Sequence, residues 1–155
     1  MDDLLKVRFE DVPSKHKNEH DEYEYYKREL VPKSESHHCA ISVYEIPPGK
    51  SAYPYHYHMK NEEAFYIISG SGVLKTSTGD KEITAGDFLF FPASEKGAHK
   101  LTNKSETEML VYLDFDTHNE IDVAFYPDSG KIGVWGKNIN QIYKTDHQVT
   151  YYDGE

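Results

Sequence analysis

Residues 56–63 read HYHMKNEE and follow a PPG turn at residues 47–49. If His56 and His58 lie in a β-strand, their imidazoles project from the same face, because side chains two positions apart in a strand point the same way. Glu63 follows four residues that suit a tight turn, so we expect a hairpin to return this carboxylate beside the two histidines. The spacing therefore predicts three ligands for one metal ion.

A fourth candidate ligand is His99, which follows the segment GDFLFFP at residues 86–92. A strand that starts near His99 would place His99, Leu101 and Asn103 on one face. Imidazole and carboxylate ligands together favour Fe, Mn, Ni, Zn, Cu or Co over Ca or Mg. We therefore expect one divalent transition metal as the cofactor.

Short apolar runs separated by turn residues surround these candidate ligands. The candidate strands are residues 39–46, 64–69, 73–78, 81–84, 88–91, 98–103, 109–115 and 121–126. Short strands at this spacing, with no helical periodicity between them, predict an antiparallel sandwich or barrel. The 13 tyrosines also favour an all-β fold, because aromatic residues are enriched in strands.

The two histidine-containing patterns together resemble the cupin family over residues 38–115. The positions that match its two motifs are Gly49, His56, His58, Glu63 and Gly70 in the first, and Gly86, Pro92, His99 and Asn103 in the second. The family's first motif has six residues between its glutamate and the following glycine. This interval before Gly70 identifies Glu63, rather than the adjacent Glu62, as the glutamate of the motif. Two connections are longer than the family's pattern, those of residues 50–55 and 93–98.

This resemblance implies a double-stranded β-helix, the cupin jelly-roll barrel, that binds a metal ion through His56, His58, Glu63 and His99. The segments YPDSGK at residues 126–131 and YYDGE at residues 151–155 also resemble a group of small, single-domain bacterial cupins without a settled activity.

We expect three regions in the chain. Residues 1–36 are a charged N-terminal arm, which could form a short helix over residues 14–30 or remain a solvated arm. Residues 37–136 form the barrel, and residues 137–155 form a C-terminal tail packed on it. The length of 155 residues suits one domain with one core.

Composition argues against several classes of partner. A formal net charge of −10 repels phosphate backbones and anionic membrane surfaces, so we expect no nucleic acid and no membrane as partners. The N-terminus lacks the basic and then apolar pattern of a signal peptide, which predicts a cytoplasmic protein. The single cysteine, Cys39, lies in a candidate strand and is interpreted as a small buried side chain.

Three histidines and one carboxylate leave coordination positions open for water, dioxygen or an oxygen-bearing substrate. We expect a metalloenzyme that acts on a small oxygen-rich molecule, with dioxygenase chemistry slightly favoured over decarboxylase or isomerase chemistry. The alternative is a non-catalytic, metal-dependent ligand-binding or sensor protein. A structural metal is disfavoured, because four ligands normally close such a site. Glu63 as a metal ligand is a poor general base, and the sequence identifies no other catalytic acid or base.

Phe65, Leu101 and Asn103 are candidate substrate-lining residues, although apolar side chains at such positions more often fill the core. The open edges of the barrel, together with the arm and the tail, predict a homodimer whose copies pair across a two-fold axis.

Overall fold

The computed structural model describes residues 4–34 and 38–155, whose regular elements are β-strands and three short 3-10 turns, so the all-β prediction is confirmed. The 3-10 turns are η1 (Phe9–Asp11), η2 (Glu95–Gly97) and η3 (Pro127–Ser129). The strands are β1 (Lys15–His20), β2 (Tyr23–Val31), β3 (Cys39–Ile46), β4 (Tyr57–His58), β5 (Glu63–Ser69), β6 (Ser71–Thr76), β7 (Gly79–Thr84), β8 (Phe88–Phe91), β9 (His99–Thr102), β10 (Leu110–Thr117), β11 (Ile121–Tyr126), β12 (Lys131–Gly136) and β13 (Ile139–Lys144). Within the described residues, no helix has the length and apolar character needed to cross a membrane.

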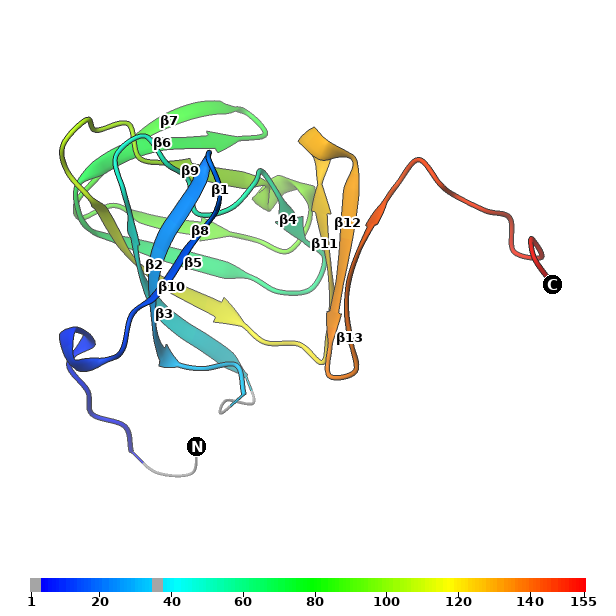
Figure 1. Ribbon diagram of the computed structural model, residues 1–155, viewed down its shortest axis with the longest axis horizontal. Coiled ribbons are helices and arrows are strands. Elements are labelled where there is room, and N and C mark those ends of the chain that lie inside the picture. Colours follow the sequence, from blue (N-terminus) through cyan, green and yellow to red (C-terminus); the bar gives the residue numbers. More distant parts are fainter. Residues whose placement is uncertain (1–3, 35–37) are drawn as a thin grey trace.

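The described residues form three sheets (Figure 1). The largest has the strand order β1-β2-β3-β10-β5-β8, and the strand order of a three-stranded sheet is β7-β6-β9. A four-stranded sheet, in the order β13-β12-β11-β4, stands at one side of these two. The barrel core lies between the first two sheets.

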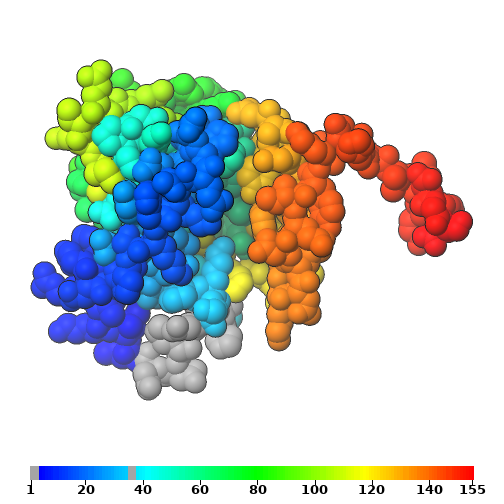
Figure 2. Space-filling model, viewed as in Figure 1, coloured from blue at the N-terminus to red at the C-terminus, as the bar shows by residue number. Residues whose placement is uncertain are grey.

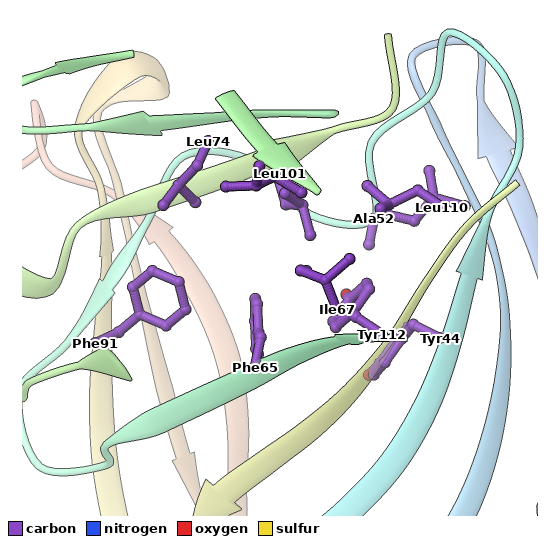
Figure 3. Packing of buried hydrophobic residues seen from close by; sticks show 11 residues of the cluster. Tyr44, Ala52, Phe65, Ile67, Leu74, Phe91, Leu101, Leu110 and Tyr112 are labelled. Atoms are coloured by element: carbon purple, nitrogen blue, oxygen red, sulfur yellow. The ribbon is translucent and has the colours of Figure 1, made fainter. Parts of the chain in front are cut away.

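The hydrophobic core is built from side chains at alternate positions of the central strands, which point to the same face of the sheet. Strands β3 and β10 bury most of their alternate positions, and the buried Ile46, Leu110 and Tyr112 are at most 1% exposed. Figure 3 shows Phe65 beside Phe91 and Tyr112, with residues of the three-stranded sheet above them. Burying such side chains stabilises the fold by roughly 1.5–3 kcal/mol each.

The N-terminal region differs from both of its expected conformations, the short helix and the solvated arm, because β2 is half-buried along its length. Residues 14–30 do not form a helix, because β1 and β2 form an antiparallel hairpin that continues the large sheet beside β3. Contacts with distant residues favour strands over a helix here. Tyr25 packs on Tyr44 at 5.4 Å between ring centroids. The backbone of β2 pairs with that of β3, which would otherwise be an open edge of the sheet. The expected boundary at residue 37 lies outside the described residues, and the division into arm, barrel and tail remains a prediction.

The C-terminal region packs on the rest of the chain only in part. Strand β13 pairs along its length with β12. Residues 146–155 extend away from the body of the molecule (Figures 1 and 2). The expected packing of the whole tail on the barrel is therefore wrong for its last ten residues, which include the exposed Val149, Tyr151 and Tyr152.

The homodimer remains a prediction, and strand β8 indicates where to test it. This strand ends the large sheet, and its Phe88 and Phe90 are 67% and 55% exposed. Apolar side chains on an open edge favour pairing with a second copy. We expect light scattering to give twice the chain mass for the wild type and the chain mass for Phe88→Glu/Phe90→Glu. Ile121→Glu, at an exposed position of the interior strand β11, should leave the dimer intact. A monomeric wild type at micromolar concentration would contradict this prediction.

Candidate metal centre

The four predicted ligands come from segments that the fold brings together. His56 precedes β4, His58 ends it, Glu63 begins β5, and His99 begins β9. His56 and His99 face each other across an isolated antiparallel bridge, in which each backbone N–H donates to the other carbonyl at 3.1 and 2.9 Å. Their ring centroids are 4.7 Å apart. A local β-bridge therefore fixes two of the imidazoles relative to one another.

Glu63 lies at the centre of this group. Its Oε1 is 3.6 Å from Nε2 of His58, and its Oε2 is 3.4 Å from Nε2 of His99 and 3.8 Å from Nε2 of His56. All four side chains are at most 15% exposed. The ligand atoms of His56, His58 and Glu63 lie within 4.8 Å of one another, so these three could hold a metal ion. His99 is next to this group through the contact of its Nε2 with Oε2 of Glu63.

The route by which Glu63 reaches the histidines differs from the expected hairpin. Strand β4 pairs with β11, whereas β5 pairs with β10 and β8, so residues 59–62 connect two sheets. The connection is held by Asp122, whose Oδ1 accepts hydrogen bonds from the backbone N–H groups of Lys60 and Asn61 at 2.8 and 3.3 Å. The predicted hairpin is therefore wrong, although Glu63 does lie beside His56 and His58.

Each imidazole is oriented by a partner on its Nδ1 atom. Nδ1 of His56 lies 2.8 Å from the carbonyl of Pro54, and Nδ1 of His99 lies 2.8 Å from the carbonyl of Gly97. Nδ1 of His58 lies 2.5 Å from Oδ2 of Asp122. Because Nδ1 is engaged in every ring, Nε2 is free to face the site, as in metal-binding histidines.

Asp122 is a residue of this site that no motif in the sequence predicted. Asp122 is 1% exposed and lies on β11, far along the chain from His58. The available signal was a charged residue inside the apolar run IDVAFY, because a buried carboxylate requires a partner.

The electrostatics of the site fit a divalent metal. Burial, together with His99, lowers the pKa of His56 to about 4, and burial also lowers the pKa of His99. Burial disfavours the charged forms of His58 and Glu63 too, but their neighbours outweigh it. Asp122 and Glu63 raise the pKa of His58 to about 10, while the histidines hold the pKa of Glu63 well below its usual range. The site thus offers two neutral imidazoles, those of His56 and His99, and the carboxylate of Glu63. A metal would displace the proton on His58.

The three candidate substrate-lining residues lie in the barrel interior. Phe65 and Leu101 belong to the hydrophobic core, and Phe65 also contacts the ring of His99 at 5.4 Å between centroids. Asn103 is fully buried and bonded to backbone groups. Contact of these residues with a substrate remains a prediction.

Asn103→Ala is expected to lower the free energy of unfolding by about 3 kcal/mol, because it leaves buried backbone groups unpaired. Asn103 Nδ2 donates to the carbonyls of Ile46 and Glu108 at 2.9 and 2.7 Å, and Oδ1 accepts from Ser105 N–H at 2.9 Å. Urea denaturation measures the loss, and the folded variant should still bind metal. Asn140→Ala, at an exposed position, is the control. A loss below about 1 kcal/mol would show that water replaces the amide.

Asp122→Asn is expected to weaken metal binding by roughly 10–100-fold, the usual effect of removing a carboxylate partner from a ligating histidine. The amide keeps the size of the side chain but removes the charge beside Nδ1 of His58. Calorimetric titration of metal-free protein with Zn²⁺ measures the change. Asp128→Asn, at an exposed position, is the control. Equal affinities in the wild type and in Asp122→Asn would show that Asp122 only holds residues 59–62 in place and does not affect metal binding.

Comparison with known proteins gives one family match. Residues 42–116 match the family model of the cupin domain. No curated protein matches the chain.

Several solved structures share the fold. A candidate sugar phosphate isomerase from Acidithiobacillus ferrooxidans has 27% identity and a TM-score of 0.83, with 95% of each chain covered. A sugar phosphate isomerase of the cupin superfamily from Silicibacter pomeroyi has 17% identity and a TM-score of 0.81, covering 96% of this chain and 98% of its own. A predicted oxalate decarboxylase from Thermotoga maritima has 24% identity and a TM-score of 0.65, covering 74% of this chain and 100% of its own.

Proposed function

Because residues 42–116 form a cupin domain with the double-stranded β-helix fold, we propose that this protein is a metal-dependent enzyme acting on a small, oxygen-rich molecule. The convergence of three histidine Nε2 atoms on the Glu63 carboxylate supports this proposal most directly. A divalent metal held by His56, His58, Glu63 and His99 would act as a Lewis acid toward oxygen atoms of the substrate. The chain's own contribution is to orient the ligands and to surround them with buried side chains.

For the reaction, we propose isomerisation of a phosphorylated sugar. The structure from Acidithiobacillus ferrooxidans supports this class, because it matches the present chain at 27% identity over nearly the whole length of both. Dioxygenase chemistry, which the sequence resemblance favoured, and decarboxylation are the alternatives. A protein that binds its ligand without turnover is the third possible outcome of the experiment below.

The experiment loads metal-free protein with single metals, including Zn²⁺, Mn²⁺ and Fe²⁺. Proton NMR follows a panel of aldose and ketose phosphates, and an oxygen electrode follows parallel reactions with small acids and diols. We expect interconversion of a sugar phosphate without oxygen uptake, and its loss in His56→Ala. His147→Ala, at an exposed position, should retain full activity.

Other results would contradict this proposal in distinct ways. Oxygen uptake with the iron form, lost in His56→Ala, would identify a dioxygenase. Tight binding of a panel compound without product would identify a binding protein. Failure of every tested metal to bind would remove the metal-dependent function itself.

A further inference from the structure

A second group of carboxylates lies beside the histidines. Asp114 and Asp116 are on β10, which pairs with β5 so that Asp116 is opposite Glu63 and Asp114 is opposite Phe65. Carboxylate oxygens of Glu63, Asp114 and Asp116 lie within 4.8 Å of one another. Asp114 is 6% exposed, and the side chain of Asp116 is 16% exposed. Three acidic groups thus share one buried space.

The oxygens of this group lack sufficient partners within the chain. Among the residues that the structure describes, Oδ1 of Asp114 and Oδ1 of Asp116 are buried without a hydrogen-bond partner. Asp116 forms an ion pair with Lys33, whose exposed Nζ lies 3.8 Å from Oδ2 of Asp116. Buried carboxylates without partners are costly, and such groups in a folded protein often mark the place of an ion.

We propose that Glu63, Asp114 and Asp116 bind a second divalent cation next to the metal held by the histidines. A site made only of carboxylates favours a hard cation such as Mg²⁺, Mn²⁺ or Ca²⁺. Oxygens that surround such an ion at about 2.0–2.6 Å lie no more than roughly 5 Å apart, so the observed spacing requires only small movements. The inference rests on the proposed function through Glu63, which both sites share.

A shared proton is the competing occupant of this space. Burial and the neighbouring carboxylates raise the pKa of Asp114 well above its usual range, and burial and Glu63 raise that of Asp116 to about 6. A proton held between the two aspartates would lower their repulsion without any ion. A cation would displace that proton, and therefore counting bound ions distinguishes the two occupants.

The test loads metal-free protein with one equivalent of Zn²⁺, which prefers imidazole ligands, and then titrates Mn²⁺. Electron paramagnetic resonance counts free Mn²⁺, and elemental analysis of dialysed protein counts both metals. We expect one Zn²⁺ and one Mn²⁺ per wild-type chain. Asp114→Asn should raise the Mn²⁺ Kd at least tenfold and leave Zn²⁺ bound. Asp80→Asn, which removes an exposed carboxylate, should change neither metal.

No Mn²⁺ bound to the zinc-loaded wild type, or an unchanged Mn²⁺ Kd in Asp114→Asn, would overturn the inference. If the variant fails to fold, crystals of the wild type soaked in Mn²⁺ decide the matter. An anomalous peak bonded to Glu63, Asp114 and Asp116 supports the second site, and its absence refutes the site. Binding of Mn²⁺ by these carboxylates in a protein whose histidines bind none of the tested metals would refute the proposed function while supporting this inference.

Discussion

Glu63→Gln is expected to reduce metal affinity by more than about 100-fold, beyond the usual effect of changing a residue that only supports a ligand. The carboxylate of Glu63 lies within 3.8 Å of Nε2 in all three histidines, so it is the anionic ligand that they share. The amide keeps the volume of the side chain and removes its charge. Without that charge, His58 loses one of the two carboxylates that face its ring.

Glu62→Gln is a closely matched control, because Glu62 is the adjacent residue and is exposed. Both variants are compared with the wild type by competition against a chromophoric chelator, and near-ultraviolet circular dichroism verifies their folding. Loss of affinity in Glu62→Gln, with normal binding in Glu63→Gln, would show that the interval before Gly70 selects the wrong carboxylate. Glu63→Gln should also lose the proposed second cation, whereas Asp114→Asn should lose that ion alone.

The strands of the barrel were predictable where turn residues mark their ends. The predicted bounds of β3, β8 and β11 agree with the structure, and each of these strands ends immediately before a proline. Proline has no N–H group to donate to a sheet, so it ends strands in a way that sequence displays directly. The convergence of His56, His58, Glu63 and His99 followed from alternation and from the resemblance to cupins.

Strand partners were harder to predict than strand positions. Alternation shows which side chains share a face, but it does not show that β4 pairs with β11 and β5 with β10. Strand β1 is exposed along its length and therefore has no apolar alternation to reveal it. Asp114, Asp116 and Asp122 were missed for a related reason. Their partners lie far away in sequence, and no fixed spacing connects them to the histidines.

Gly97→Ala is expected to damage both the fold and the metal site. A Cβ atom at Gly97 would lie 2.0 Å from the backbone oxygen of Pro92 and 3.1 Å from its backbone nitrogen. Backbone atoms cannot rotate away as the end of a side chain can, so the turn η2 must shift. We expect the free energy of unfolding to fall by about 3 kcal/mol, at the upper end of the usual cost of overpacking.

The same shift should reach the metal site, because the carbonyl of Gly97 orients His99 through Nδ1 at 2.8 Å. We therefore expect Zn²⁺ affinity to fall at least tenfold in the fraction of Gly97→Ala that remains folded. Urea denaturation and calorimetric titration of the same preparation measure the two effects, and Lys96→Ala, at the exposed neighbouring position, should show neither. Lower stability with unchanged affinity would show that His99 is held by its bridge to His56 rather than by this carbonyl.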